Sequence, residues 1–159
     1  MEYSINEDVL NIAVANVLAS LQGVNNLYNS QLSTLKLLLE GKNVFLTSPT
    51  NSGKSLPPLI LPSICLELTK LGFRYPASPR VLFITALNSI QHSLLSSSIQ
   101  LNISCAAVTS DNVTEVLNSE ASVLFVGPEV LKTKKVTKAL LQQRDSFVCK
   151  VIDEVHLGK

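Results

Sequence analysis

The stretch Val44-Phe45-Leu46-Thr47-Ser48-Pro49-Thr50-Asn51-Ser52-Gly53-Lys54-Ser55 decides the fold more than any other part of the chain. Its apolar beginning predicts a short buried strand. The rest fits the phosphate-binding loop pattern Gly-x-x-x-x-Gly-Lys-Ser/Thr, except that Ser48 stands in place of the first glycine. In such loops, backbone N–H groups and the N-terminus of the next helix bind phosphate oxygens. The stretch therefore predicts a strand, a nucleotide-binding loop and a helix in succession.

The individual residues of this loop suit ATP and Mg²⁺. Gly53 lets the backbone approach the phosphates, and Asn51 tolerates the positive φ that such loops often need. Lys54 would bridge the β- and γ-phosphates, and the Ser55 hydroxyl would ligate Mg²⁺. A glycine-containing surface turn is the alternative, which the flanking strand and helix disfavour. The predicted nucleotide-binding residues of the loop are Ser48, Pro49, Thr50, Asn51, Ser52, Gly53, Lys54 and Ser55.

A second motif, Asp153-Glu154-Val155-His156, follows an apolar run at residues 147–152. An α/β nucleotidase places its magnesium-binding carboxylate at the end of such a strand. Asp153 would hold Mg²⁺ together with Ser55, and Glu154 would orient and deprotonate the attacking water. His156 would couple the site to neighbouring elements. Alone, this motif could be a solvated acidic turn; with the loop, it predicts the catalytic residues Lys54, Asp153, Glu154 and His156.

Strands and helices are predicted to alternate along the chain. A helix is expected from Ser4, with Glu7 completing a capping box, to Leu21. A second is expected from about Gln31 to Gly41, and a third at about 54–70, bent by its internal prolines. Further strands are predicted at 81–85, 103–108, 122–126 and 147–152. This order predicts an α/β fold with a mainly parallel sheet and helices on both faces.

The composition limits the classes of function. The 159 residues are 46% apolar, and 13 basic against 12 acidic residues give a net charge of +1. Any nucleic-acid contact must therefore be a local patch. Cys65, Cys105 and Cys149 form no CxxC pair and are interpreted as buried thiols in a reducing compartment. No apolar run reaches the ~20 residues that span a bilayer. We expect a soluble, intracellular protein without a membrane partner, nuclear if its source is eukaryotic.

These motifs resemble those of the RecQ-like DNA helicases, which are superfamily-two helicases of the DEAH type. Pro49-Thr50 before the glycine, Ser55-Leu56 after the lysine and the Asp-Glu-x-His box match the RecQ pattern. Gln31 lies 23 residues before Lys54, a spacing similar to that of the adenine-recognising glutamine of RecQ proteins. The resemblance implies that Gln31 contacts adenine. Tyr28 stands where the family usually has an arginine and would stack on the base.

The resemblance also implies a nucleic-acid partner, single-stranded or partly duplex DNA. Residues 81–90 and 123–131 resemble helicase motifs that lie under the strand, which makes Asn88, Ser89 and Glu129 candidates for the DNA-facing surface. A lysine-rich segment follows these motifs. On a helix, some of its lysines could share a phosphate-neutralising face, although a solvated charged face is the favoured interpretation. They are Lys132, Lys134, Lys135 and Lys138.

The predicted organisation is an N-terminal helix at 1–24 and a partial helicase ATP-binding domain at 25–159. By the resemblance, the latter is a RecA-like P-loop NTPase domain that is truncated C-terminally and lacks the second RecA-like domain. The expected function is ATP binding, coupled in the complete protein to 3′–5′ DNA unwinding. Two alternatives remain open: an RNA helicase of the DExH type, and a catalytically inactive nucleotide-binding or nucleic-acid-docking module.

Overall fold

The computed structural model describes residues 6–21, 26–40, 56–85, 95–96 and 98–152. Helices and strands alternate along most of this length, as predicted. The elements are α1 (Glu7–Ser20), α2 (Asn29–Leu39), α3 (Leu56–Lys70), β1 (Arg80–Ile84), β2 (Cys105–Val108), α5 (Val113–Leu117), β3 (Val123–Val126), α6 (Pro128–Leu131), α7 (Lys134–Gln142), a 3₁₀ turn (Arg144–Ser146) and β4 (Phe147–Ile152). The strand predicted at 44–47 lies outside the described residues.

The strands form one parallel sheet in the order β2-β3-β1-β4. The central strand β1 pairs with β3 in a register that places Val81 beside Val123 and Phe83 beside Phe125. All four strands lie within two residues of their predicted bounds, and β4 matches its prediction at both ends. The parallel sheet of the predicted α/β fold is confirmed.

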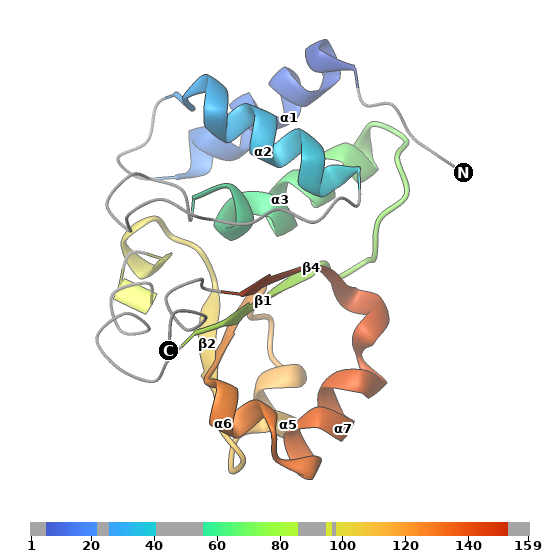
Figure 1. Cartoon of the computed structure of the whole chain (residues 1–159). Coiled ribbons are helices and arrows are strands. Elements are labelled where there is room, and N and C mark those ends of the chain that lie inside the picture. Colours follow the sequence, from blue (N-terminus) through green and yellow to red (C-terminus); the bar gives the residue numbers. More distant parts are fainter. Residues whose placement is uncertain (1–5, 22–25, 41–55, 86–94, 97, 153–159) are drawn as a thin grey trace.

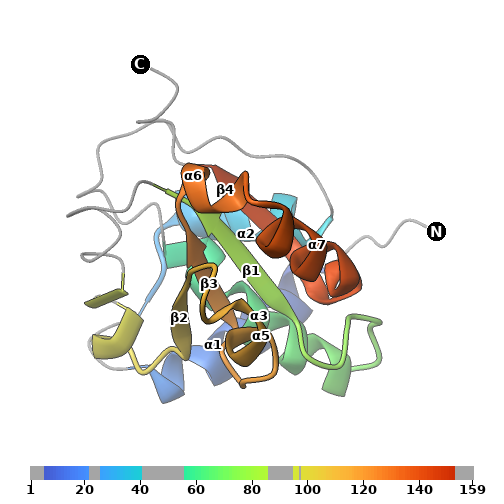
Figure 2. The same cartoon turned by 90° about the horizontal axis from the view of Figure 1, so that it is seen from below.

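Helices cover both faces of the sheet, as predicted (Figure 1). Successive side chains on a strand point to opposite faces. Val81 and Phe83 of β1 accordingly belong to the cluster of buried residues that α1, α2 and α3 contribute to, whereas Leu82 belongs to the cluster with α5 and α7. We call these two sides the α3 face and the α7 face. Figure 2, seen from below, shows α5, α6 and α7 lying across the strands.

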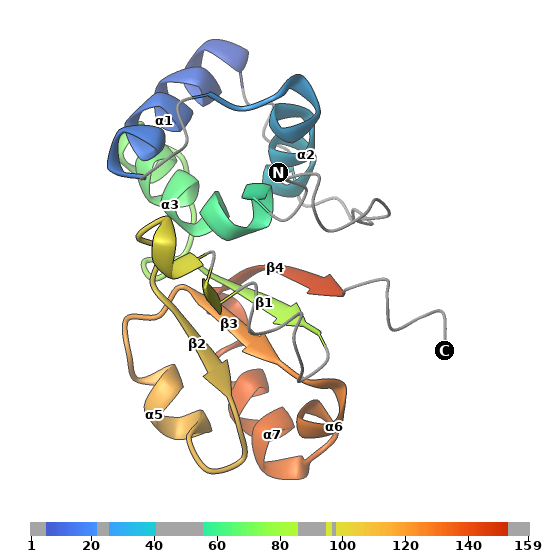
Figure 3. The same cartoon turned by 90° about the vertical axis from the view of Figure 1, so that its left-hand side faces the viewer.

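The α3 face has two helical layers. α3 contacts β1 and β4, and both α1 and α2 pack against α3. The first half of α3 is consequently buried on every side, from Pro57 through Pro62 without a break. A helix that is apolar all around is typical of a core position. Pro62 lies inside α3, and the ribbon bends along its length in Figure 3, as the internal prolines predicted.

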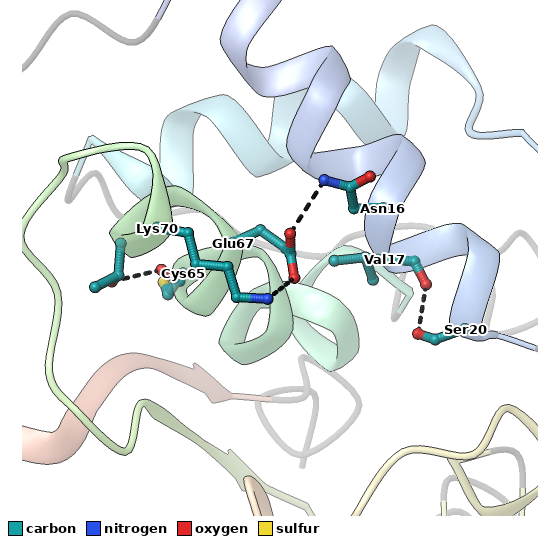
Figure 4. A network of polar contacts seen from close by, with 7 residues as sticks. Asn16, Val17, Ser20, Cys65, Glu67 and Lys70 are labelled. Carbon is teal, nitrogen blue, oxygen red and sulfur yellow. Dashed lines mark hydrogen bonds and ion pairs between the residues drawn. The ribbon is translucent and has the colours of Figure 1, made fainter.

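The beginning of α1 differs from the prediction. Asn6, not Ser4, is the N-cap, and its Oδ1 accepts a hydrogen bond of 2.8 Å from the backbone N–H of Asp8. Both residue types cap helices well, so a sequence with both near the helix start does not distinguish them. α1 is tied to α3 by Asn16, whose Nδ2 donates to Glu67 Oε1 at 3.1 Å (Figure 4). Glu67 also pairs with Lys70 at 3.0 Å.

Candidate functional site

The carboxyl ends of the strands define the candidate site. All four strands are parallel, so these ends lie along one edge of the sheet, which is where open α/β sheets bind ligands (Figure 3). At this edge the N–H of buried Thr85 donates to the carbonyl of Val126 at 3.0 Å. The hydrogen bond holds the ends of β1 and β3 together. The carboxyl ends of β1 and β3 are therefore held in fixed positions, and loops that follow them can carry binding groups.

The two predicted motifs adjoin, in the sequence, elements that pack in or against this sheet. Their residues, Ser48 to Ser55 and Asp153 to His156, lie outside the described residues, as do Asn88 and Ser89. The adjoining elements are described. α3 begins at Leu56, directly after the loop, and β4 ends at Ile152, directly before the acidic box. Because α3 packs against β4, the elements next to the two motifs are neighbours in the fold.

Gln31 and Tyr28 lie together at the start of α2. Tyr28 is the N-cap residue, and its backbone N–H donates to Gln31 Oε1 at 2.7 Å. The Gln31 side chain is buried with only 6% of the residue exposed, whereas Tyr28 is 74% exposed. The glutamine thus helps to satisfy an N–H at the helix start, and the tyrosine ring is accessible to a ligand. Adenine recognition by these two residues stays a prediction.

Glu129 lies in α6, which begins directly after the carboxyl end of β3. Its side chain is exposed to solvent. Glu129 therefore follows the carboxyl end of β3 by three residues and is accessible to solvent. A DNA-facing position requires such accessibility. A contact with DNA stays a prediction.

The lysine-rich segment divides into two parts. Lys132, Lys134 and Lys138 line an open groove of about 580 Å³, and Lys135 does not. Sequence reasoning missed a fourth cation in this groove, Arg144 of the 3₁₀ turn after α7. The spacing of Lys134 and Lys138, one helical turn apart, was the only sequence signal for the shared face.

A buried arginine at the opposite edge was also missed. Arg80 opens β1 and is only 6% exposed. Its Nη2 donates to the carbonyls of Leu117 at 2.7 Å and Ser119 at 2.9 Å. Burial lowers the pKa of its guanidinium. Leu117 ends α5, so the cation faces the negative end of a helix dipole. Arg80 stabilises the fold at the amino edge, away from the candidate site.

Cys65 is buried, as interpreted from the sequence, whereas Cys105 and Cys149 are only partly buried. Burial raises the pKa of the Cys65 thiol to about 12, with Cys149 as a second cause, and that of Cys149 to about 11. Burial also raises the pKa of Cys105. Such thiols stay protonated at neutral pH and are poor nucleophiles. Among the described residues, no three His, Cys, Asp or Glu side chains gather into a metal-binding group.

No helix in the described part of the chain has the length and apolar character to cross a membrane. This finding agrees with the absence of a long apolar run in the sequence.

Comparison with known proteins gives a distant relationship to a helicase. No protein-family model matches the chain. The chain is 30% identical over 139 residues to an ATP-dependent DNA helicase Q1 from Pongo abelii. The match covers 79% of this chain and 20% of that helicase, so the chain spans about a fifth of the relative's length. Together with the α/β fold and its four-stranded parallel sheet, which are compatible with a RecA-like domain, this is a helicase-like relationship.

Proposed function

We propose that the chain binds Mg–ATP as part of a helicase-like motor of the RecQ type. The observation that supports this most is the packing of α3 against β4, since these elements adjoin the loop at 48–55 and the acidic box at 153–156. An arrangement in which both motifs border one edge of a parallel sheet would follow from this packing, and it is the arrangement that a nucleotide site requires. The similarity to an ATP-dependent DNA helicase agrees with this assignment.

Under this proposal, the residues of the loop hold the phosphates and Lys54 neutralises their charge. Ser55 and Asp153 hold Mg²⁺, which supplies charge neutralisation at the transferring phosphoryl group. Glu154 orients the attacking water, and His156 links the site to its surroundings. Tyr28 and Gln31 contact adenine. The exposed Tyr28 ring can stack on a planar base, and the Gln31 side-chain amide beside it is positioned by its hydrogen bond to the Tyr28 N–H.

The partner we propose is DNA, bound near the carboxyl edge at Asn88, Ser89 and Glu129. In a protein that also holds a second RecA-like domain, hydrolysis would drive 3′–5′ unwinding. Such a protein works inside the cell and, in a eukaryote, in the nucleus. The ATP-dependent DNA helicase activity in these proposals extends to this chain what the name of the similar helicase states. The direction of unwinding, the second domain and the nuclear location are what the resemblance to RecQ-like helicases implies.

Equilibrium binding of a fluorescent ATP analogue with Mg²⁺ tests the proposal. We expect Lys54→Ala to weaken binding by at least about tenfold, because a charge-assisted phosphate contact contributes roughly 1.5 to 3 kcal/mol. Lys135→Ala is the matched control, since it removes the same side chain from an exposed position on α7. Equal affinity of the Lys54→Ala variant and the unsubstituted chain would refute the assignment of the loop.

A further inference from the structure

A groove at the outer side of the α7 face gathers positive charge from three elements. Lys132 follows α6, Lys134 and Lys138 belong to α7, and Arg144 belongs to the 3₁₀ turn. All four side chains are exposed. The other residues that line the groove are Thr137, Leu141 and Gln142. The lining contains no carboxylate.

The helical register of α7 explains why two of its lysines line the groove. Lys134, Lys138 and Leu141 lie at i, i+4 and i+7, which places them on one side of the helix. Val136 and Leu140 are buried on the opposite side against the sheet. Lys134 and Lys138 are therefore about 6 Å apart along the helix axis and point away from the core.

The two ends of the groove are held in place by local hydrogen bonds. The Thr137 hydroxyl donates to the Leu131 carbonyl, which fixes the start of α7 against the end of α6. Arg144 Nη1 donates to the Leu141 carbonyl at 3.3 Å. In the described part of the chain, neither Lys132, Lys134, Lys138 nor Arg144 forms an ion pair with a carboxylate. The four charges are thus available to an outside anion.

The charge of this segment differs in sign from that of the remaining chain. Residues 132–145 hold five basic residues and one acidic residue, Asp145, which gives the segment +4. The remaining eight basic and eleven acidic residues leave the rest of the chain at −3. An approaching polyanion is therefore attracted more strongly to this segment than to the rest of the chain, whose net charge is negative. The net charge of +1 conceals this asymmetry.

We propose that this groove binds the phosphodiester backbone of single-stranded DNA. A row of cations with no carboxylate complements a chain of phosphates, and Leu141, which is 52% exposed between the cations, offers an apolar contact to sugars or bases. The choice of DNA rests on the proposed helicase-like function. The groove is a second contact region, lined by residues other than Asn88, Ser89 and Glu129. It would hold the strand by charge without reading its sequence.

The salt dependence of DNA binding tests this assignment. The probe is a fluorescein-labelled oligothymidylate of about 20 nucleotides, titrated at several salt concentrations with the unsubstituted chain and with Lys134→Gln/Lys138→Gln. For single strands, log K falls with log salt by about 0.7 per neutralised phosphate. We expect the slope to become shallower by about 1.4 in the double variant, and the affinity at 0.1 M salt to fall by roughly 10- to 30-fold.

Lys135→Gln is the matched control, because Lys135 is exposed on the same helix but does not line the groove. Its slope should equal that of the unsubstituted chain. Lys132→Gln/Arg144→Gln is a second variant outside α7 and should repeat the effect of the first. Circular dichroism of each variant verifies folding.

The outcomes separate this proposal from the proposed function. Unchanged slopes in both double variants, an equal change in the Lys135→Gln control, or a chain that binds anionic phosphatidylserine vesicles but no oligonucleotide would each overturn the groove as a DNA site. Binding of the ATP analogue, measured on the same samples, reports independently on the nucleotide site. Lost ATP binding with a normal salt slope would refute the nucleotide site and leave the groove in place.

Discussion

The two faces of the sheet are covered in different ways. On the α3 face, α1 and α2 form a second layer over α3, so that the first half of α3 has buried residues all around its axis (Figure 1). On the α7 face, short helices form one layer, and α7 buries only Val136 and Leu140. The first arrangement closes an apolar core. The second leaves an outer helix surface in contact with solvent, and this surface carries the basic groove.

This difference indicates that the α3 face contributes mainly to stability and the outer side of α7 mainly to binding. An all-around apolar helix must be covered on every side, whereas an amphipathic helix keeps one side for charged residues. The larger cluster of buried residues lies on the α3 face and includes residues of α1, α2, α3 and β1. We therefore expect substitutions on the α3 face to change stability most, and substitutions on the outer side of α7 to change binding.

The largest expected effect compares two leucines on opposite faces. Leu61 of α3 is 1% exposed and Leu140 of α7 is 7% exposed. Leu→Ala in a core costs roughly 2 to 5 kcal/mol, and more where the surroundings cannot close the cavity. We predict a loss of about 4 kcal/mol for Leu61→Ala and about 2 kcal/mol for Leu140→Ala in urea unfolding. Equal losses, or a larger loss at Leu140, would contradict the difference between the faces.

The next effect concerns Arg80, which holds the end of α5 on the α7 face. Arg80→Met keeps much of the side-chain volume but leaves the carbonyls of Leu117 and Ser119 without this donor. We predict a loss of about 2 kcal/mol in the free energy of unfolding. Arg74→Met is the control, because Arg74 is exposed and should tolerate the change. If both variants unfold at the same urea concentration, the buried hydrogen bonds contribute nothing.

The smallest effect concerns the contact between α1 and α3. Asn16 and Glu67 lie near the surface, where solvent weakens their hydrogen bond (Figure 4). A double-mutant cycle with Asn16→Ala and Glu67→Ala should give a coupling energy of about 0.5 kcal/mol. A coupling energy of zero would mean that α1 is held on α3 by apolar contacts alone.

The sequence predicted the sheet better than the surfaces. Strands that are buried are mostly apolar runs, and such runs predicted both ends of β4, although Lys150 within it is exposed. The bounds of the other three strands were predicted to within two residues. The N-cap of α1 was assigned to Ser4 instead of Asn6, because several nearby residues can cap a helix. The sequence shows such capping candidates but does not rank them.

The contribution of Arg144 to the groove and the burial of Arg80 could not be predicted, for a different reason. Both depend on contacts between segments whose relative positions the fold decides. Arg144 joins the lysines of α7 only because a 3₁₀ turn follows that helix. Arg80 reaches the end of α5, 37 residues away along the chain. The residues of the nucleotide motifs were predicted from sequence patterns and stay predictions.

Hydrogen exchange with and without the Mg–ATP analogue tests the central claim most directly, because it reports on both motif-adjoining elements at once. The account predicts slower exchange in peptides from the first turn of α3 and from the end of β4, with no change in α7 and no protection in the Lys54→Ala variant. Protection that is absent from both α3 and β4, or that survives in the Lys54→Ala variant, would contradict a nucleotide site at the carboxyl edge of the sheet.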